Sequence, residues 1–268
     1  MPTALGPHNP RLAAVHRLLT PAGRREQRRF TAEGPTLLAE AERSGLVPRE
    51  VYATERGLAV VGTEAVARLE HSAVPVYEVP ERAYARLSDL ETASGVLAVL
   101  DLPEREPADV IARDGPVLLL AGVGDPGNAG TLVRSAEAFG AAGVLFGRGG
   151  VDPFNPKTVR AAMGSLFRVP LAQVDPGELF ALAERSGRTI VAADKDGDDL
   201  RTVALPPRVV LAVGNERRGV RDWLPRWDRA VRIPQRPDAE SLNAAVAGSV
   251  LLYEVFRCQD PCQAAENR

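Results

Sequence analysis

The stretch PVLLLAGVGDPGNAGTLVRSAEAFG, residues 116–140, decides the fold of the second half of the chain. It opens with a nearly continuous apolar run, as expected of a strand buried on both faces of a parallel sheet. Gly122, Gly124 and Gly127 follow with the spacing G-x-G-x-x-G, which after a strand is typical of a dinucleotide-binding site. Pro126 fits the tight turn of such a site poorly. The stretch therefore predicts an α/β fold and leaves its ligand open.

The alternation of strands and helices continues to the end of the chain. A helix is expected from about residue 129 to residue 139, directly after the first strand. The pattern predicts a mostly parallel sheet with helices on both faces, whose ligands bind outside the carboxyl ends of the strands. Further strands are expected at 142–147, 189–194, 208–214 and 229–235, and further helices at 155–166, 176–187 and 241–257.

Shorter elements alternate in the first part of the chain, enough for one compact α/β domain over residues 1–101. Residues 102–115 are charged, contain prolines and lack periodicity, so we expect a linker there. Residues 116–268 then form the second domain. Within the first domain, helices are expected at 35–45, 62–71 and 81–90, and strands at 50–55, 73–80 and 94–103.

The composition, 45% hydrophobic and 25% charged, is that of a soluble globular protein. The longest apolar run, residues 244–253, is too short to cross a bilayer. The N-terminal sequence lacks the charged start and apolar stretch of a signal peptide. A cytoplasmic location without a membrane partner is therefore expected.

Cysteines and histidines give little support to metal or covalent chemistry. Cys258 and Cys262 are the two cysteines, and there is no second pair with which to hold zinc. His8, His16 and His71 are scattered through the N-terminal part, so no nucleophile has an evident base. We expect neither a metal site nor a covalent hydrolase.

Basic residues gather near the N-terminus, although the net charge of the whole chain is only −2. Residues 11–29 contain six arginines and a single acidic residue, Glu26. Such a cluster is either a solvated helix face or a patch that binds phosphates. Its members are Arg11, Arg17, Arg24, Arg25, Arg28 and Arg29.

The loop after the first strand of the second domain carries unusual polar residues. Asn128 and Gly130 are expected to make a turn, and Arg134 follows in the helix beside the apolar Leu132 and Val133. An arginine on a helix packed against the sheet needs a carboxylate or a ligand phosphate as partner. The alternative is a capping asparagine and an arginine in a salt bridge inside the fold.

Two later loops also follow strands. AVGNERRGV, residues 212–220, places Glu216 between Gly214 and Gly219, and glycines let a backbone approach a ligand closely. IPQRPDAESLNAAVA, residues 233–247, offers Ser241 as an N-cap for the last helix and Asn243 within its first turn. Taken singly, each loop is also consistent with an ordinary turn or a capped helix.

Together, in this order and at these distances, the three loops resemble the signature motifs of the SpoU (TrmH-like) RNA ribose 2′-O-methyltransferases, a family of the SPOUT superfamily. DPGNAGTLVRSAEAFG resembles the first motif, VGNERRGV the second and IPQRPDAESLNAAVA the third, and DPFNPKTVRAAMGSLFRVP resembles the connecting segment. The resemblance covers residues 116–255 densely. Residues 11–101 resemble, more loosely, the accessory RNA-binding domain of this family, which is like ribosomal protein L30e. The third motif departs at Gln235, where the family has a hydrophobic residue, and at Ala244 and Ala245.

The resemblance implies a C-terminal domain in which the second and third motif loops form a trefoil knot, an exception to the rule against knots. These loops would hold S-adenosylmethionine, and the active site would lie at or near the interface of a homodimer. Cofactor contacts would fall mainly on the backbones of three residues, with two neighbours beside them. These are Gly214, Ile233 and Leu242, with Gly219 and Gln235.

The implied reaction is the attack of a ribose 2′-hydroxyl on a sulfonium methyl group, which requires no metal. Family proposals place the arginine of the first motif, here Arg134, beside that hydroxyl as the base or its helper. A guanidinium rarely deprotonates, so we expect it to bind the adjacent phosphate and stabilise the developing alkoxide. Asn128, Glu216, Ser241 and Asn243 would orient Arg134, the ribose or the loops. The six N-terminal arginines and Arg160 would bind RNA.

Ribosomal RNA, most simply 23S, is the expected substrate, and transfer RNA is the alternative. A non-catalytic RNA-binding module is a second alternative, which the complete polar set of the three motifs disfavours. An NADP-dependent oxidoreductase is the third. Arg148 and Asp152, near the end of the second strand of the sheet, could serve its nucleotide. It leaves Asn128, Arg134 and the two later loops unexplained.

Overall fold

The computed structural model describes residues 2–236, 238 and 240–259. The chain divides into two compact units. The first consists of Met1–Glu104 with Phe154–Phe167, and the second of Arg105–Pro153 with Arg168–Arg268. The segment 154–167 thus belongs with the first unit, whereas the sequence had assigned it to the second domain.

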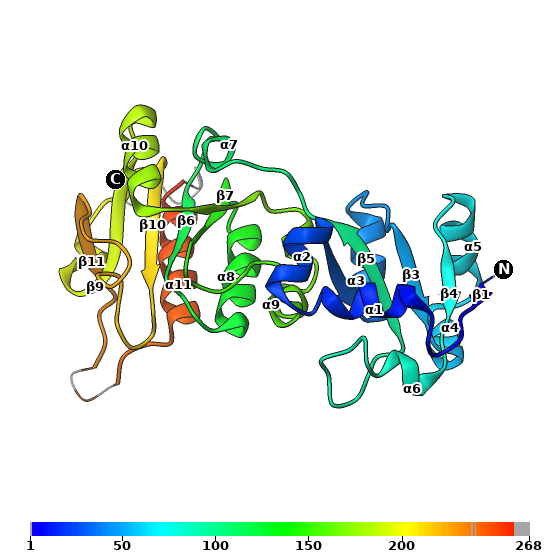
Figure 1. Ribbon diagram of the computed structural model, residues 1–268. Coiled ribbons are helices and arrows are strands. Elements are labelled where there is room, and N and C mark those ends of the chain that lie inside the picture. The colour runs from blue at the N-terminus through cyan, green and yellow to red at the C-terminus, as the bar shows by residue number, and fades with distance from the viewer. Residues whose placement is uncertain (1, 237, 239, 260–268) are drawn as a thin grey trace. The chain divides into compact units, whose positions relative to one another are not determined.

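The second unit is built on a six-stranded sheet of order β11-β9-β10-β6-β7-β8 (Figure 1). Every pairing in this sheet is parallel. Its central strands read as apolar runs because helices cover both of their faces. The strands are β6 (Val117–Ala121), β7 (Gly143–Gly147), β8 (Leu171–Val174), β9 (Thr189–Asp199), β10 (Val209–Gly214) and β11 (Arg229–Arg232).

Two pairs of helices cover this sheet. α7 (Pro107–Ile111) and α10 (Pro176–Ser186) pack on one face, where Val110 and Leu179 share a buried cluster with alternate strand residues such as Leu119. α8 (Pro126–Ala138) and α11 (Ala244–Gln259) pack on the other (Figure 1). The predicted parallel α/β architecture is confirmed. The trefoil knot stays a prediction.

Several helix boundaries differ from those expected, because side-chain caps decide them. α8 begins at Pro126, because the carboxylate of Asp125 accepts a hydrogen bond from the Asn128 backbone N–H at 2.7 Å. Asn128 therefore lies in the first turn of a helix rather than in a turn with Gly130. α11 begins at Ala244 and not at residue 241, so Ser241 is not its cap.

Residues 102–115 were expected to be a linker, but most of them are part of the second unit. α7 lies within them, and Val110 and Ile111 are buried in the core of this unit. The charged residues and Pro103 lie on exposed positions, whereas Pro107 is buried with Val110 and Ile111.

The first unit has a mixed five-stranded sheet of order β1-β4-β3-β5-β2. β5 is antiparallel to β2 and β3, while β4 is parallel to β1 and β3. Its strands are β1 (Thr3–Ala4), β2 (Arg29–Glu33), β3 (Glu50–Ala53), β4 (Val76–Glu78) and β5 (Val96–Asp101). Its helices are α1 (Pro10–Arg17), α2 (Pro21–Gln27), α3 (Pro35–Arg43), α4 (Glu55–Val61), α5 (Thr63–His71), α6 (Glu81–Tyr84) and α9 (Pro156–Ala161).

The segment 154–167 completes the core of the first unit over β2. The rings of Phe154 and Phe167 lie with their centroids 4.9 and 6.3 Å from that of Phe30 on β2. The helix expected at 155–166 is shorter, since α9 ends at Ala161 and a 3₁₀ turn, Ser165–Phe167, follows.

The helix expected at 81–90 is also shorter, because the buried Glu33 draws the residues after α6 towards β2. Its carboxylate accepts hydrogen bonds from Ser88 Oγ at 2.8 Å and from the Ser94 backbone N–H at 3.2 Å. These bonds hold residues 88–94 as an irregular loop, so α6 ends at Tyr84.

Arg188 fixes the chain between α7 and β6. It is only 4% exposed, and its guanidinium donates to the carbonyl oxygens of Ile111 and Gly115, each at 2.8 Å, and of Arg113. A buried cation is tolerated where hydrogen bonds satisfy it. Here one acceptor is the carbonyl of Ile111, which the end of α7 leaves without a helical partner, and the other two belong to the turn that follows.

Replacing Arg188 with methionine should destabilise the second unit by about 2–4 kcal/mol, because a buried acceptor without a donor costs about 1–3 kcal/mol. Both tryptophans of the chain, Trp223 and Trp227, lie in this unit, so urea unfolding followed by tryptophan fluorescence isolates its stability. Arg185→Met, an exposed arginine in the last turn of α10, is the matched control. Equal unfolding midpoints for the two variants would contradict this role.

Candidate functional site

The side chain of Asn128 joins the three loops that the sequence singled out. Its Nδ2 donates to Glu216 Oε1 at 2.6 Å. Its Oδ1 accepts from Asn243 Nδ2 at 2.9 Å. The first loop is thus bonded at once to the loop after β10 and to the start of α11. Of the five residues expected to be catalytic, these three lie in one hydrogen-bonded chain.

Asn243 also caps α11. Its Oδ1 accepts from the backbone N–H groups of Ala245 at 2.8 Å and of Val246 at 3.3 Å. The cap that was expected from Ser241 is therefore supplied two residues later. The position of Asn243 in the sequence, which looked unfavourable for a helix interior, is explained because it precedes the helix.

Asn215 holds the second loop in shape and was not selected from the sequence. Its Oδ1 accepts from the backbone N–H groups of Arg217 and Arg218 at 3.0 and 3.2 Å. Its Nδ2 donates to the carbonyl of Gly122 in the first loop at 3.3 Å. An asparagine that follows a strand and opens a turn is a recognisable signal for such a role.

The two glycines of the second loop are required by the chain itself. A Cβ on Gly214 would lie 2.3 Å from the backbone of Gly219 and Val220, and Gly219 has a φ of +71°. Both values describe a loop that folds back onto the end of β10. The sequence had attributed these glycines to close approach of a ligand.

Trp223 explains Gly122 of the opening stretch and Gly147 at the end of β7. A Cβ on Gly122, which has a φ of +73°, would lie 3.2 Å from the Trp223 side chain, and one on Gly147 would lie 2.6 Å from its ring. The indole N–H donates to the Arg148 carbonyl at 2.8 Å. The indole thus lies over the ends of β6 and β7, where a doubly wound dinucleotide-binding protein would place its ligand.

Arg134 is exposed on α8 and has no side-chain partner among the described residues. The alternative of a salt bridge inside the fold is therefore not realised in the described part of the chain. A guanidinium without a partner in the described part is available for an anion that comes from outside the protein.

The third loop is open between β11 and Asn243. Ile233 is half-buried, whereas Gln235, Ser241 and Leu242 are exposed, the last at 37%. Among residues 233–236, 238 and 240–242, none makes a backbone–backbone hydrogen bond outside the regular elements. The backbone groups of these residues are therefore available to contact a ligand.

Arg24, predicted to bind RNA, is buried instead. It is 1% exposed, and its Nη1 donates to the carbonyl of Leu18 at 2.8 Å. The reason is that α2 packs closely on the end of α1, where a Cβ on Gly23 would collide with the Arg17 backbone. Arg24 therefore belongs to the core of the first unit and not to its surface.

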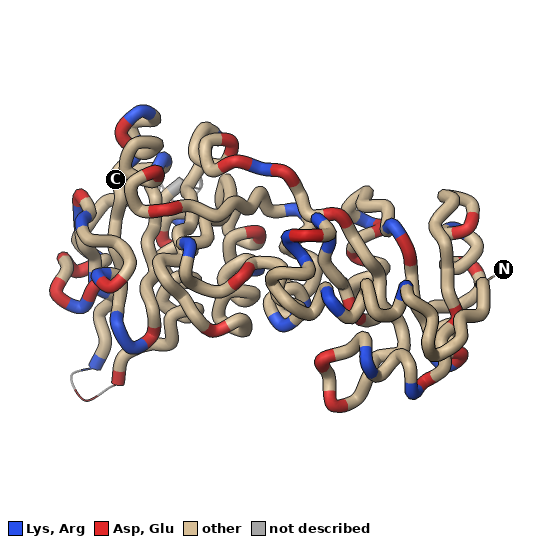
Figure 2. The backbone as a smooth tube through the Cα atoms, in the orientation of Figure 1, with Lys and Arg blue, Asp and Glu red and all other residues tan. Residues whose placement is uncertain are grey.

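The other N-terminal arginines lie at or near the surface, and most face acidic groups there. Arg11 is paired with Glu50 at 3.3 Å and Arg28 with Glu104 at 2.9 Å. Figure 2 shows this mixture of basic and acidic positions along the first unit. Arg17 contacts Glu26, Arg29 contacts Glu50 and Asp101, and Arg25 is exposed.

Arg160 binds another part of the first unit. It forms a two-bond ion pair with Asp89, with nitrogen–oxygen distances of 2.5 and 3.0 Å. Burial raises the pKa of Asp89, but the hydrogen bonds and charge of Arg160 outweigh it, so this pKa lies below its ordinary value. The guanidinium expected to contact RNA is thus already engaged with a carboxylate.

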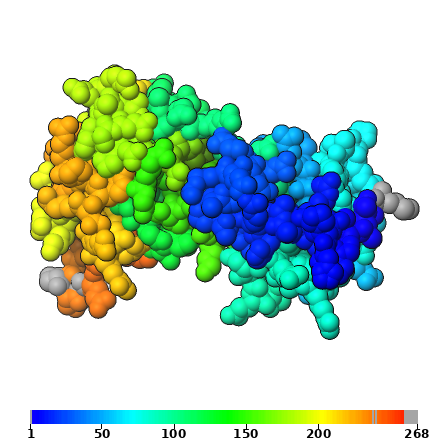
Figure 3. Space-filling view, in the orientation of Figure 1, coloured from blue at the N-terminus to red at the C-terminus, as the bar shows by residue number. Residues whose placement is uncertain are grey.

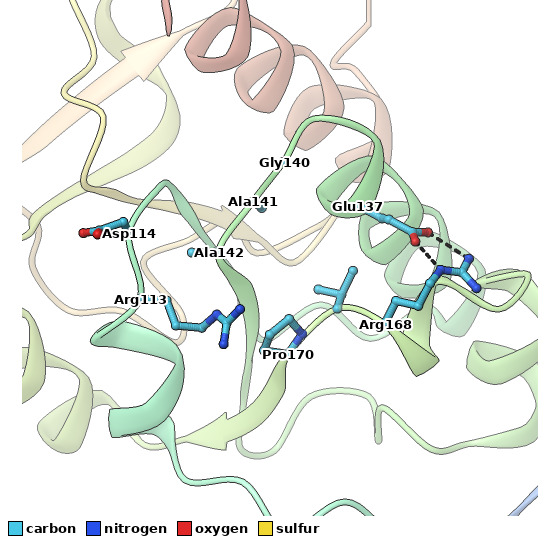
Figure 4. Close-up of a pocket in the computed structure, with 9 residues that line it drawn as sticks. Arg113, Asp114, Glu137, Gly140, Ala141, Ala142, Arg168 and Pro170 are labelled. Carbon is cyan, nitrogen blue, oxygen red and sulfur yellow. Dashed lines mark hydrogen bonds and ion pairs between the residues drawn. The ribbon is translucent and has the colours of Figure 1, made fainter. Parts of the chain in front are cut away.

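A different hollow lies at the amino ends of β6, β7 and β8, away from the three loops (Figure 4). Glu137 and Arg168, which line it, form an ion pair across one side. It contains none of the predicted site residues.

Among the described residues there is no cluster of histidine, cysteine, aspartate or glutamate that could hold a metal ion. No helix in the described part is long and apolar enough to cross a membrane. Cys258 is an exposed free thiol, and Cys262 lies outside the described residues.

Both parts of the chain match known families. Residues 115–253 match the SpoU rRNA Methylase family, and residues 9–98 match the MRM3-like substrate binding domain. The chain is 32% identical over 241 residues to the 23S rRNA (guanosine(2553)-2′-O)-methyltransferase RlmP of Bacillus subtilis, covering 89% of this chain and 93% of that protein.

Solved structures extend the likeness to three dimensions. An AdoMet-bound rRNA methyltransferase from Sinorhizobium meliloti superimposes with a TM-score of 0.82 at 29% identity, covering 96% of this chain and 98% of that one. The SpoU methyltransferase AviRb from Streptomyces viridochromogenes, in complex with AdoMet, gives 0.81 at 28% identity, covering 94% and 98%. On the sequence match and the fold together, the chain belongs to the SpoU rRNA methylase family.

Proposed function

We propose that this protein transfers a methyl group from S-adenosylmethionine to a ribose 2′-hydroxyl of 23S ribosomal RNA. The observation that carries the proposal is the hydrogen-bonded set Glu216–Asn128–Asn243, which joins the three loops. On the same helix as Asn128, Arg134 is exposed and has no side-chain partner among the described residues. RlmP, by its name, methylates a guanosine 2′-oxygen of 23S rRNA, which favours ribosomal over transfer RNA.

The residues of the third loop fit an adenosyl cofactor. Ile233 and Leu242 offer apolar side-chain surface, and the backbone groups of residues 233–236 and 240–242 are available to bond a polar ring edge. Gly214, Gly219 and Gln235 would border the same site. The bound cofactor supplies a methyl group that its sulfonium already activates. The trefoil knot is part of the proposal, as the means by which these loops are held together.

Arg134 would bind the phosphate next to the target ribose and stabilise the alkoxide that develops on its 2′-oxygen. Its guanidinium has a pKa above about 12 and does not serve as the base. Asn128 positions the first turn of α8 relative to Glu216 and Asn243. Ser241, exposed beside the third loop, would orient the ribose.

The structure offers little to the alternative of a nicotinamide-dependent oxidoreductase. Trp223 lies against Gly122 and Gly147, where such an enzyme would need open glycines for the pyrophosphate. A non-catalytic RNA-binding module would not need the hydrogen bonds that join Asn128 to Glu216 and Asn243.

A homodimer is the proposed assembly, and α11 supplies its contact face. Val246, Tyr253 and Phe256 are 48%, 48% and 43% exposed, and their spacing places them on one side of the helix. The ring of Phe139, near the end of α8, lies 5.6 Å from Tyr253 and 6.0 Å from Phe256. A second copy covering this patch would bring the two active sites near the interface, in the cytoplasm where ribosomal RNA is found.

Arg134→Ala should lower methyl transfer at least about 100-fold, because a preorganised cation next to developing charge is lost. The assay supplies S-adenosylmethionine with a labelled methyl group and unmodified ribosomal RNA, with transfer RNA in a parallel reaction. Cofactor affinity, measured by calorimetry, should stay within about twofold, and Arg185→Ala should behave as wild type. Transfer at the wild-type rate in Arg134→Ala would contradict the role, and label in transfer RNA alone would contradict the substrate.

Asn128→Asp should disrupt the site more than Asn128→Ala, because a carboxylate would then face the Glu216 carboxylate. Adding Glu216→Gln to Asn128→Asp should recover about 1–2 kcal/mol, since the new amide can donate to the new carboxylate. The measurement is a double-mutant cycle on thermal stability and on cofactor affinity. Strictly additive effects of the two substitutions would show that the pair does not interact.

Phe256→Glu should convert the dimer into a monomer, because it places a charge in the centre of an apolar interface. Sedimentation equilibrium over a range of protein concentrations measures this. The control is Val60→Glu, since Val60 on α4 is 62% exposed. A wild-type monomer at all concentrations, or a dimeric Phe256→Glu variant, would overturn the proposed interface.

A further inference from the structure

A cavity of about 490 Å³ opens on the first unit. Its walls are α1 with the residues before it and the segment 83–88 that includes the end of α6. Leu12, Ala83 and Leu87 are buried and form an apolar floor. In Figure 3, the dark-blue residues of α1 are exposed on the face towards the viewer, with the turquoise residues of the eighties beneath them.

Both walls of this cavity are held in place from behind. Asn9 caps α1, its Oδ1 accepting from the Arg11 backbone N–H at 3.0 Å. On the other wall, Ser88 Oγ donates to the buried Glu33 at 2.8 Å. The carboxylate of the next residue, Asp89, accepts hydrogen bonds from both terminal nitrogens, Nη1 and Nη2, of Arg160. The cavity is therefore preformed. Arg160 does not line it, but holds Asp89, the residue that follows the cavity wall.

The rim carries planar polar groups. His16 Nδ1 lies 2.6 Å from the Arg86 carbonyl oxygen. A carbonyl only accepts, so Nδ1 carries the hydrogen and donates, which fixes the ring and leaves Nε2 for another partner. The side chains of His8 and Arg86 are exposed and have no side-chain partner within the part of the chain that the structure describes.

An apolar floor with flat, nitrogen-bearing groups above it suits a flat heterocycle with polar edges. Single-stranded RNA is recognised in this way, by unstacked bases that lie against aromatic or guanidinium planes and form hydrogen bonds through their edges. The volume lies within the roughly 300–1,000 Å³ usual for small-ligand sites. Arg86 can in addition attract the phosphate that accompanies the base.

We propose that this cavity receives one unstacked base of the substrate RNA, and so anchors the RNA at a point separate from the methylation site. The inference rests on the proposed function, because it takes RNA as the substrate. In this proposal the N-terminal arginines contribute less to RNA binding than the cavity does, since most of them already face carboxylates.

Filling the cavity tests this proposal. Ala13 and Ala14 are adjacent, exposed residues of α1, and only Ala13 lines the cavity. Ala13→Trp should weaken binding of a fluorescein-labelled, unstructured 12-nucleotide RNA about tenfold, because stacking of a base is lost. Ala14→Trp should bind as wild type. A 12-base-pair RNA duplex, whose bases are stacked, should bind both variants equally. A second pair of variants repeats the comparison without adding a large side chain. Arg86→Gln changes a residue that lines the cavity and should weaken binding of the single strand, whereas Arg82→Gln is the control outside the cavity.

The outcomes separate this inference from the proposed function. If wild type methylates ribosomal RNA but Ala13→Trp and Ala14→Trp bind the single strand equally, the cavity is not a base site. Equal weakening of single strand and duplex by Ala13→Trp would also overturn it, since the surface would then contact the backbone only. Absence of methylation by wild type would instead count against the proposed function, whatever the binding results.

Discussion

The carboxamide of Asn128 is the constraint on which the site depends. It must donate to Glu216 and accept from Asn243 at once, and only an amide side chain of this length offers both. Aspartate would lose the donor and serine could not reach both partners. Because the three residues are far apart in sequence, this one side chain closes two long loops onto the first turn of α8.

The glycines around this side chain serve the packing of the protein itself. Gly122 and Gly147 make room for Trp223, and Gly214 makes room for the returning loop at Gly219. Neither requirement involves a dinucleotide, although Gly122 belongs to the spacing of a dinucleotide-binding fingerprint. A motif match is therefore informative only when the neighbours of each glycine are known, because the same absence of a Cβ can serve a ring, a backbone or a ligand.

The sequence predicted five of the six strands in the sheet of the second unit, because strands such as β6 and β10 are continuous apolar runs. It missed β8, a short strand at the edge of the sheet. It also selected Asn128, Glu216 and Asn243 through the resemblance of three loops. It could not show that these residues bond to one another, since the bonds join positions far apart in the chain. The cap of α11 and the roles of Asn215 and Trp223 were missed for the same reason.

Charged residues were the least predictable part. Arg24 looked like its neighbours in sequence, yet it is buried against the Leu18 carbonyl. Arg160 was expected at an RNA surface and is bonded to Asp89. Arginine count and spacing carry no information on whether a carboxylate or carbonyl lies opposite, and that decides whether the guanidinium is free for a ligand. Arg134, on the same helix as Asn128, has no side-chain partner among the described residues.

The chemical position of the transferred methyl group distinguishes ribose methylation from base methylation. Ribosomal RNA labelled by the protein and S-adenosylmethionine is digested with alkali, which cleaves next to every free 2′-hydroxyl. A methylated 2′-oxygen blocks that cleavage, so the account predicts label in alkali-resistant dinucleotides. Label released only as mononucleotides would place the methyl group on a base and contradict it.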